Sequence, residues 1–456
     1  MSEPIISVSG LRGTIGEQLT PAVASRYMAA LASSIPVVRG ATVVLGRDGR
    51  ESGAMLSRAV AATLQAHGLD VVDLGVAATP TVGVAVRKLQ AAAGVQISAS
   101  HNPREYNGLK LFNAQGRVFP KLEGEQVLAA YRANQHRWVP VDDLGGFCTD
   151  NDPHSHHLKS VLATVDVDAI KSKRFKVLLD SNHGAGGLLG APLLQALGCQ
   201  LTLLGGDPDG QFSHPPEPLA ENLTDVSRQV CGQGYDVVFC QDPDADRLAV
   251  IDENGLFIGE EFTLALCLMQ MLPQLVPSDG GSTTIVTNCA TSSLSKVLAA
   301  KYDCKFMQSA VGEANVADLM IAEKAVFGGE GNGGPIDPAV GYVRDSFVGM
   351  ARILELMATS GASISELVQQ LPPLSMIKDK ATLDSAKLPA LLDRLTAKCD
   401  DAASSRLDGL KLDWPDRWLL VRGSNTEPIV RFIAEAPTTA EAQQLCDLAR
   451  QIADGV

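Results

Sequence analysis

Three aspartates alternate along one short polar loop of this sequence. Asp242, Asp244 and Asp246 lie in DPDADR, directly after the apolar run YDVVFC at 235–240. Carboxylate oxygens are hard ligands, and Mg²⁺ accepts near-octahedral oxygen coordination that leaves positions for phosphate and water. Arg247 follows the triplet and supplies a guanidinium suited to a phosphate. The loop lacks the glycine and glutamate of an EF-hand, which disfavours a calcium site of that type. A solvated acidic turn is the structural alternative.

A serine and a histidine follow a different apolar run. In ISASHNPREYNGLK (97–110), Ser100 stands beside His101 and has small neighbours. The segment lacks the Gly-x-Ser-x-Gly frame of a nucleophile elbow, so an α/β-hydrolase site is not supported. Taken alone, these residues are explained more simply by a helix cap or an Asx turn.

Two glycine-containing loops carry groups that bind sugars and phosphates. GGEGNGG (328–334) surrounds Glu330 and Asn332 with glycines, so the backbone can approach a ligand closely while the carboxylate accepts paired hydroxyls. RGSNTEPIVR (422–431) concentrates donors of the kinds that hold a dianionic phosphate. Those donors are Arg422, Ser424, Asn425, Thr426 and Arg431. An ordinary glycine turn and a structural hairpin loop are the alternatives.

Predicted strands position these loops. The first third of the chain alternates β-branched runs with amphipathic helical runs, which is typical of an α/β layer with parallel strands. Two further segments repeat the order strand, turn and helix, then a strand ending in a polar loop, so we infer a repeated architecture. Thr20 and Thr79 each precede a proline and predict helix starts with hydroxyl caps. The predicted strands are 41–46, 93–98, 175–180, 235–240, 283–288 and 324–329.

Polar, turn-rich segments predict the domain boundaries. They occur near 148–157, 252–255 and 369–374. The predicted domains of the 456-residue chain are three α/β units at 1–150, 151–255 and 256–369 and an α+β unit at 370–456. Within the last unit we predict a helix around 385–398, strands around 409–421 and 429–435, and a final helix from Thr439.

The overall composition limits the partners and the location. The formal charge is −14, from 38 basic and 52 acidic residues, so we expect neither nucleic acid nor an anionic membrane as a partner. No apolar stretch reaches the ~20 residues of a membrane span, and MSEPIISVSG is not a basic leader, so we expect a cytoplasmic protein. Nine cysteines occur singly, without metal-ligand spacing, and predict buried free thiols.

Taken in order, SASHNP, DPDADR, GEGNGG and RGSNTEPxxR closely resemble the four active-site loops of the α-D-phosphohexomutases. GLRG at 10–13, GRDGR at 46–50 and EPLAENL at 217–223 are similar to flanking pieces of the same family. The resemblance covers nearly the whole chain, with one loop for each predicted domain. It implies an α/β fold of three topologically similar domains with mixed sheets, followed by a C-terminal α+β domain related to the TATA-box-binding fold.

The resemblance also implies a role for each matching residue. Ser100 would be phosphorylated in the active enzyme, and its phosphate would bind Mg²⁺ together with Asp242, Asp244 and Asp246. Lys110 matches a candidate general acid/base of the family. The other matches are Arg12 and Arg247 for the transferring phosphoryl group, His101 beside the phosphoserine, Glu330 and Asn332 for the sugar, and Arg422, Ser424, Asn425, Thr426 and Arg431 for the non-reacting phosphate.

The implied activity is the interconversion of a hexose 6-phosphate and a hexose 1-phosphate. It would pass through a phosphoserine and a 1,6-bisphosphate intermediate, with Mg²⁺ as cofactor and a glucose- or hexosamine-1,6-bisphosphate as activator. The expected partner is a phosphosugar, and the expected assembly is a monomer or a homodimer. A phosphatase of the aspartyl-phosphate type would leave Ser100 without a role. A non-catalytic sugar-phosphate sensor would be expected to have lost Ser100 or an aspartate, and none is lost.

The preferred sugar depends on the third loop. The resemblance and the chemistry of Asn332 favour a glucosamine phosphate, because an amide serves a 2-amino substituent as both donor and acceptor. Dual specificity for mannose and glucose phosphates is the alternative. Gly334 stands where many members have a histidine, and Glu313 stands where some have a basic residue or a histidine. Both departures lie in the sugar-selecting region.

Overall fold

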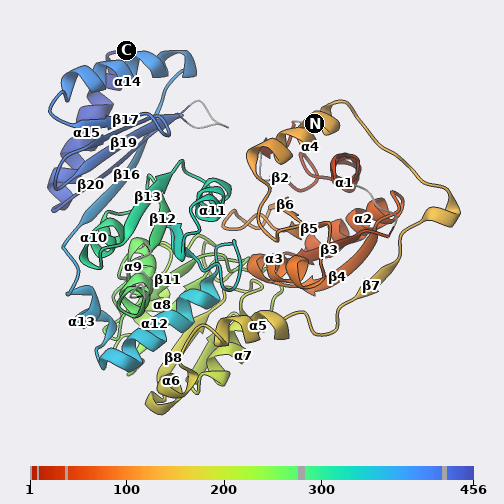
Figure 1. The fold of residues 1–456 in the computed structure, drawn as a ribbon, viewed down its shortest axis with the longest axis horizontal. Coiled ribbons are helices and arrows are strands. Elements are labelled where there is room, and N and C mark those ends of the chain that lie inside the picture. The colour runs from red at the N-terminus through yellow and green to blue at the C-terminus, as the bar shows by residue number, and fades with distance from the viewer. Residues whose placement is uncertain (1–2, 8–9, 36–39, 276–282, 424–428) are drawn as a thin grey trace.

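Four β-sheets follow one another along the chain. The computed structural model describes residues 3–7, 10–35, 40–275, 283–423 and 429–456 (Figure 1). Strands β1–β7 form the first sheet, β8–β11 the second, β12–β15 the third and β16–β20 the fourth. We call the parts of the chain that carry these sheets domains I to IV. Figure 1 shows domain I on one side of the molecule and domain IV on the other, with domains II and III between them.

The first three sheets share one four-stranded arrangement. In each, a central strand pairs in parallel with a strand on either side, and a fourth strand runs antiparallel beside the third. Domain I adds β1 (Ile5–Ser7), β2 (Gly10–Thr14) and β7 (Phe147–Thr149). The predicted repeat of α/β units with mixed sheets is thereby confirmed. In domain I the four strands are β3 (Thr42–Arg47), β4 (Asp70–Val76), β5 (Ala93–Ile97) and β6 (Tyr106–Asn113). Their counterparts in domain II are β8 (Lys176–Asp180), β9 (Gln200–Leu204), β10 (Val237–Gln241) and β11 (Leu248–Ile251). In domain III they are β12 (Thr284–Asn288), β13 (Lys305–Ser309), β14 (Phe327–Glu330) and β15 (Gly334–Ile336).

Six of these strands match the six predicted ones, and they place the polar loops together. The largest shift is at β14, which begins at Phe327 rather than at residue 324. The loops after β5, β10 and β14 leave the carboxyl ends of parallel strands in their own sheets. Such ends collect functional residues because the loops there are free of the strand ladder while their bases are held rigidly.

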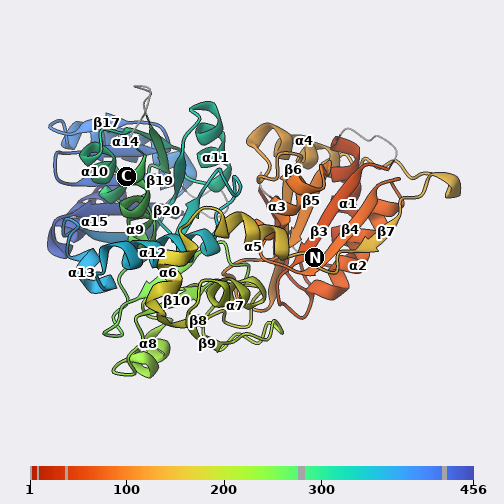
Figure 2. The same cartoon turned by 60° about the horizontal axis from the view of Figure 1, so that its bottom comes forward.

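Domains II and III share one hydrophobic core. Its buried side chains come from β8 and β10, from α9 (Glu260–Met271), and from α12 (Ser346–Ser360), which is buried along most of its length. Domain I joins this core through α3 (Thr79–Lys88), which packs against α5 (Ser155–Leu162) (Figure 2). The loops of the three domains are therefore held against one another by continuous packing.

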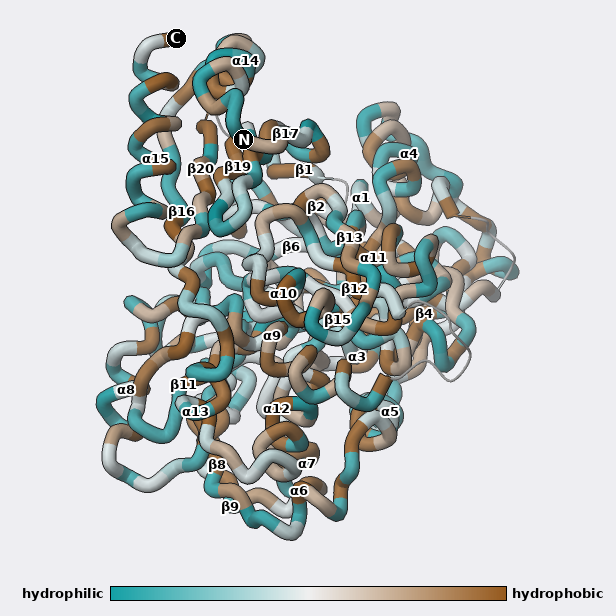
Figure 3. The backbone as a smooth tube through the Cα atoms, turned by 60° about the vertical axis from the view of Figure 1, so that its left-hand side comes forward, coloured by the Kyte–Doolittle hydropathy of each residue, from teal (hydrophilic) through white to brown (hydrophobic). Residues whose placement is uncertain are grey.

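Domain IV has the predicted α+β character. Its antiparallel sheet has the order β16-β20-β19-β18-β17, and α14 (Leu388–Lys398) and α15 (Thr439–Asp454) pack into one core with it. Hydrophobic and hydrophilic residues interleave along α15 (Figure 3). The helix buries its hydrophobic stripe and leaves the hydrophilic side exposed. On β19, Leu419 and Val421 face this core, while Trp418 and Leu420 pack toward domain III. The strand bounds are β16 (Ser375–Thr382), β17 (Ala403–Ser405), β18 (Leu410–Asp413), β19 (Trp418–Gly423) and β20 (Ile429–Ala436); β16 and β17 were not predicted.

Two local predictions need correction. Thr20 caps α1 (Pro21–Ser34) as expected, accepting a hydrogen bond from the Val23 amide. Thr79, in contrast, is the first residue of α3, and its hydroxyl does not cap that helix. All nine cysteines lie in described segments and are free, but Cys148 and Cys231 are exposed rather than buried, and Cys199 and Cys304 are only partly buried. Within the described ranges, no helix is both long and apolar enough to cross a membrane.

Candidate active site

Ser100 lies in a strained turn that points its hydroxyl at domain II. The turn follows β5, and Ser100 has a φ of +47°, a left-handed conformation that costs a non-glycine residue free energy. Its Oγ donates to Asp242 Oδ2 at 2.7 Å and lies 3.3 Å from His101 Nδ1. A strained backbone conformation persists only where the surrounding structure holds it in place, and such residues cluster at functional sites.

The three aspartates form one buried carboxylate cluster. Asp242, Asp244 and Asp246 are 0 % exposed, and each offers an oxygen within 4.8 Å of the other two. The loop curves because Asp242 Oδ1 accepts from the backbone amides of Asp246 and Arg247, at 3.1 and 3.0 Å. Ala245 takes a positive φ of 55° inside this curve. The predicted convergence of alternate carboxylates thus has a local backbone cause.

Cations and a hydroxyl compensate the carboxylates. Lys110 Nζ lies 3.2 Å from Asp244 Oδ2 and 2.9 Å from Asp246 Oδ2. Burial raises the pKa of Asp244, but Lys110 and the hydrogen bond from Thr79 Oγ1 help lower it below its usual value. Burial by itself would lower the pKa of Lys110, but the charges of Asp244 and Asp246 outweigh burial and raise this pKa above its usual value. Lys110 therefore stays protonated. For Asp242, burial together with the charges of Asp244 and Asp246 outweighs Arg247 and raises its pKa well above the usual range.

Arg344 connects the metal-binding candidates to the sugar loop. Its Nη2 donates to Asp246 Oδ2 at 2.7 Å and its Nη1 to Glu330 Oε2 at 2.9 Å. Glu313 Oε2 lies 3.6 Å from Arg344 Nε, and Glu313 Oε1 accepts from the Arg344 amide at 2.9 Å. The sequence analysis assigned no role to Arg344. Neither its spacing nor its neighbours distinguish it from the chain's other arginines.

The cluster suits a hard divalent cation. In the part of the chain that the structure describes, the buried Oδ1 atoms of Asp244 and Asp246 accept no hydrogen bond. Buried carboxylate oxygens without donors are costly unless a cation binds them. Asp242, Asp244 and Asp246 all offer carboxylate oxygens. Ser100 Oγ, the predicted site of a phosphate, lies 2.7 Å from Asp242 Oδ2. These observations fit Mg²⁺ held by three aspartates and one phosphate oxygen.

Two further arginines flank this site from different domains. Arg12, on β2, donates from Nη1 to Asn102 Oδ1 at 2.6 Å beside the Ser100 turn. Arg247 donates from Nη1 to Glu217 Oε1 at 3.3 Å. Glu217 Oε1 also lies 3.9 Å from His101 Nε2. The EPLAENL segment, which begins at Glu217, therefore contacts both the loop of Ser100 and the loop of the three aspartates. Burial, with Arg247 and Arg12 nearby, lowers the pKa of His101 to about 2, which keeps the imidazole neutral.

The sugar loop presents one well-held carboxylate and one amide oxygen without a donor. Glu330 Oε1 accepts from Asn288 Nδ2 at 2.7 Å and from the Gly312 amide at 3.1 Å. Within the described residues, the buried Asn332 Oδ1 accepts no hydrogen bond. A Cβ at Gly334 would lie 2.4 Å from Arg344 Cδ. Arg344 therefore occupies the space that a larger side chain at residue 334 would need, and Glu313 balances its charge.

Domain IV carries the predicted phosphate loop. Arg422 and Arg431 are cross-strand partners on β19 and β20, and Arg431 is exposed. Arg422 Nε lies 3.0 Å from Asp408 Oδ2, which also accepts from the Val311 amide of domain III at 3.0 Å. Arg422 is thus linked through Asp408 to Val311, next to the Gly312 amide that donates to Glu330. Ser424, Asn425 and Thr426 lie outside the described residues.

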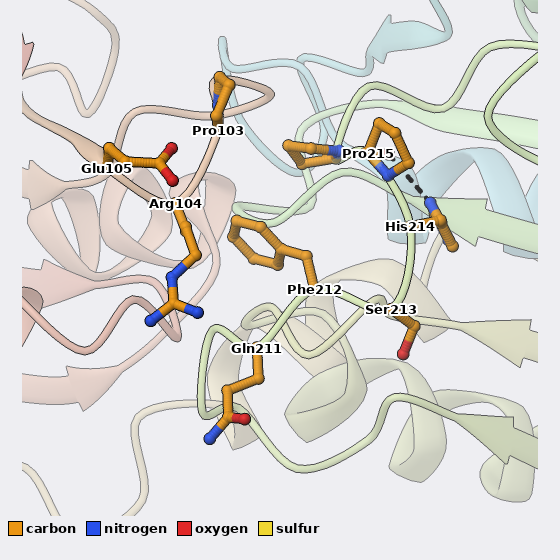
Figure 4. Close-up of a pocket in the computed structure, with 9 residues that line it drawn as sticks. Pro103, Arg104, Glu105, Gln211, Phe212, Ser213, His214 and Pro215 are labelled. Carbon is orange, nitrogen blue, oxygen red and sulfur yellow. Dashed lines mark hydrogen bonds between the residues drawn. The ribbon is translucent and has the colours of Figure 1, made fainter.

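A shallow cavity of about 510 Å³ lies beside the Ser100 turn, away from the aspartates. Residues 103–105 of domain I line one side, and residues 211–216 of domain II line the other (Figure 4). Figure 4 shows Phe212 facing Arg104 across it, and Arg104 is 64 % exposed. The cavity marks the seam where domain II meets the Ser100 turn, and it contains none of the predicted catalytic residues.

Comparisons with known proteins agree with this architecture. Four models of the phosphoglucomutase/phosphomannomutase family match: the alpha/beta/alpha domains I, II and III at residues 5–138, 152–255 and 260–374, and the C-terminal domain at 379–452. The chain is 35 % identical to a phosphoglucomutase/phosphomannomutase of Thermococcus kodakarensis, with 96 % of both proteins covered. It is 32 % identical to a probable phosphoglucosamine mutase of Methanopyrus kandleri, with 96 % of this chain and 95 % of that protein covered.

A solved structure extends the match. A phosphoglucomutase/phosphomannomutase family protein of Burkholderia thailandensis superposes with a TM-score of 0.85 at 27 % identity, over 98 % of this chain and 97 % of that one. The fold and the loops define a phosphosugar mutase, an isomerase that transfers a phosphoryl group within its substrate. The chain belongs to the phosphoglucomutase/phosphomannomutase family. The family predicted from the four loops is confirmed.

Proposed function

We propose that phosphorylated Ser100 gives its phosphoryl group to the free C1 or C6 oxygen of a hexose phosphate and takes the phosphoryl group at the other position back, so that the 6-phosphate and the 1-phosphate interconvert. The observation that supports this most directly is the 2.7 Å hydrogen bond from Ser100 Oγ to Asp242, at the edge of a fully buried cluster of three aspartates. A serine placed this way can accept a phosphoryl group whose charge is met by a cation on the aspartates. Unassisted cleavage of a phosphate monoester is extremely slow, so positioning and charge neutralisation must provide most of the rate enhancement.

The charges around Ser100 fit that chemistry. Phosphoserine and the three aspartates bring together roughly five negative charges, counting about two for the phosphate. Asp242, Asp244 and Asp246 would hold Mg²⁺, which when bound supplies neutralisation of the transferring phosphoryl group. Lys110 holds a proton at Nζ that it can give to a leaving oxygen or take back from an attacking one. Arg12, which donates to Asn102 of the Ser100 turn, and Arg247, which donates to Glu217, are proposed to bind the phosphoryl oxygens.

The remaining loops would hold the other end of the substrate. Glu330 and Asn332 are proposed to bind sugar hydroxyl and amino groups, and Arg422 and Arg431, with Ser424, Asn425 and Thr426, to bind the non-reacting phosphate. A clamp that accepts either phosphate lets a 1,6-bisphosphate turn over and present its second phosphate to Ser100. A glucose- or hexosamine-1,6-bisphosphate would accordingly activate an unphosphorylated enzyme. Exclusion of water by domain IV would separate mutase from phosphatase activity.

For the sugar we propose glucosamine phosphate. Asn332 Oδ1 is a buried acceptor without a donor among the described residues, and a 2-amino group would supply one. Several relatives at 30 to 32 % identity are named probable phosphoglucosamine mutase. Dual specificity for mannose and glucose phosphates is the second candidate, because the relative at 35 % identity is named phosphoglucomutase/phosphomannomutase. Comparing kcat/KM on glucosamine-, mannose- and glucose-phosphate decides between them.

The test of the covalent role is Ser100→Ala. We expect the variant to fold normally and to lose mutase activity, because the hydroxyl is the proposed carrier and its loss removes few packing contacts. Intact mass after incubation with hexose 1,6-bisphosphate should show a phosphate on the parent and none on the variant. Activity within tenfold of the parent, measured with the bisphosphate present, would exclude the phosphoserine route.

A further inference from the structure

A buried aspartate and arginine form the turn after β3, directly beneath the Ser100 loop. Asp48 is 0 % exposed and Arg50 is 2 % exposed. Arginine is almost never buried this completely unless its donors are all used. The two side chains are paired, with Arg50 Nε 3.1 Å from Asp48 Oδ2. The pair lies in the GRDGR segment, whose function the sequence does not reveal.

The guanidinium of Arg50 has five acceptors for its five N–H groups. Besides the Asp48 carboxylate, all of them are backbone carbonyls of residues 100–106. The bonds are Nη2 to Ser100 O at 2.6 Å and to Asn102 O at 2.6 Å, and Nη1 to Pro103 O at 2.7 Å and to Tyr106 O at 3.0 Å. Four carbonyls of one loop therefore converge on a single planar group.

Asp48 holds the same loop through the side chain of Ser98. Its Oδ2 accepts from Ser98 Oγ at 2.7 Å, and Ser98 Oγ in turn accepts from the Ser100 amide at 2.8 Å. Both the amide and the carbonyl of Ser100 are thus fixed through the Asp48–Arg50 pair. This explains how Ser100 is kept in a left-handed conformation that a serine would otherwise leave.

Domain II closes this arrangement from outside. The Phe212 ring lies over the guanidinium, with Arg50 Cζ 5.0 Å from the ring centroid. The backbones also meet closely, since a Cβ at Gly210 would lie 2.7 Å from Arg50 Cα. Phe212 lines the cavity beside the Ser100 turn (Figure 4). The segment that carries Phe212 therefore keeps water from the bonds that shape the Ser100 loop.

We infer that Arg50 is a positioning residue for phosphoryl transfer, whose guanidinium sets the backbone around Ser100 so that its Oγ faces Asp242. The inference rests on the proposed role of Ser100 as carrier. Arg50 itself contacts neither the carboxylate cluster nor Ser100 Oγ, so it acts through the loop. A lysine cannot replace it, because an ammonium has three donors on a flexible stem and cannot address carbonyls in a fixed plane.

The experiment compares Arg50→Lys with a matched control, Arg352→Lys. Arg352 is also buried and paired, with its Nη2 2.8 Å from Asp337 Oδ2, but it lies in α12 away from the Ser100 loop. For Arg50→Lys we expect kcat to fall by about a hundredfold, because misplacement of a reacting group by roughly 1 Å has that effect. KM should stay within about threefold, since the sugar and far phosphate loops are untouched. The control should lower the melting temperature comparably and leave kcat nearly unchanged.

A second variant guards against misfolding of the first. Ser98→Ala removes one small hydroxyl, and we expect kcat to fall by about tenfold with an unchanged melting temperature. Guanidinium at sub-denaturing concentration should partly restore kcat to Arg50→Ala and have no such effect on Arg352→Ala. Parent-like kcat in both Ser98→Ala and Arg50→Lys would overturn the inference. So would a fall in the kcat of Arg352→Lys as large as that of Arg50→Lys at a comparable drop in melting temperature. An active Ser100→Ala would instead refute the proposed carrier, so the two failures are distinguishable.

Discussion

Replacing Arg344 by methionine tests the charge network that joins the aspartate cluster to the sugar loop. Methionine keeps an unbranched apolar stem and removes the guanidinium. Three buried carboxylates, those of Asp246, Glu313 and Glu330, then lose their shared cation. We expect the variant to be clearly less stable than the parent and to lose most of its activity.

The magnitude follows from the contacts that remain. Removing one partner of a buried ion pair typically costs about 3–5 kcal/mol, because the other charge is left uncompensated. Asp246 keeps Lys110 at 2.9 Å, and Glu330 keeps the Asn288 side chain at 2.7 Å and the Gly312 amide at 3.1 Å. The expected loss is therefore at the lower end of that range, about 3 kcal/mol at neutral pH.

The loss should shrink as the solution becomes acidic. Burial raises the pKa of Asp246, and Arg344 with Lys110 lowers it below its usual value in the parent. That stabilisation is present above the unfolded pKa of about 3.9 and disappears as the pH falls through the lower folded value. In the variant, burial is no longer offset by Arg344 and raises the pKa of Asp246. Protonation of Asp246 in acidic solution then removes the free-energy cost of burying its charge. The stability gap should thus be wider at about pH 7.5 than at about pH 5.

Calorimetric unfolding of parent and variant, with and without Mg²⁺, measures the gap. Because a four-domain chain need not unfold in one step, the transition assigned to domains II and III is the one to follow. Arg352→Met is the matched control, since Arg352 is also buried but pairs with carboxylates outside the aspartate cluster and the sugar loop, those of Asp337 at 2.8 Å and Glu355 at 4.0 Å. A gap for Arg344→Met below about 1 kcal/mol, or one that widens on acidification, would refute the reasoning.

Two further variants probe other parts of the site, and a third probes Glu261 on α9. Asp244→Asn should weaken the dependence of activity on Mg²⁺ and lower kcat, since an amide brings no charge to the cation; superimposable metal titrations would show that the aspartate loop has another role. Asn332→Ser should reduce kcat/KM for glucosamine phosphate several-fold to about tenfold more than for glucose phosphate, and equal losses would remove the residue that supports the amino sugar. Burial raises the pKa of Glu261 to about 8, although Lys378 is near. A carboxyl with a raised folded pKa costs stability as the pH rises from its unfolded pKa toward 8, so Glu261→Gln should gain stability over the parent at about pH 8 and little at about pH 4.5. Thermal unfolding at the two values measures this, and a constant difference would contradict it.

Local patterns were sufficient for six strands of domains I to III, and they indicated the loops in which we place the reacting groups. The runs before Ser100, Asp242 and Glu330 consist mostly of apolar, β-branched and glycine residues and end in polar loops, which is a signal contained in consecutive residues. Alternation of three aspartates likewise predicts convergence on one cation, and the structure adds the bonds that curve the loop. The strand β16 escaped prediction because three consecutive charged residues, Lys378, Asp379 and Lys380, interrupt SMIKDKAT, so no apolar run marks it.

Partners that are distant in sequence could be found only in the folded chain. Thr79 has the local signature of a cap, yet its hydroxyl bonds Asp244, 165 positions away. Arg344 is 98 positions from Asp246, and Arg50 is 50 positions from Ser100. With 38 basic residues in the chain, spacing cannot indicate which of them meets a given carboxylate or carbonyl.

The sequence by itself determined the family, and it predicted the loops proposed to carry the reacting groups and the kinds of ligand they suit, because these depend on short runs of residue types. The tertiary structure alone decided how those groups are charged and oriented. Packing of domains I, II and III around α3, α9 and α12 brings Lys110, Arg344 and Thr79 to the aspartates and Arg50 to the Ser100 loop. A buried charge must find its partner in three dimensions, and that choice is made by the whole fold rather than by neighbouring residues.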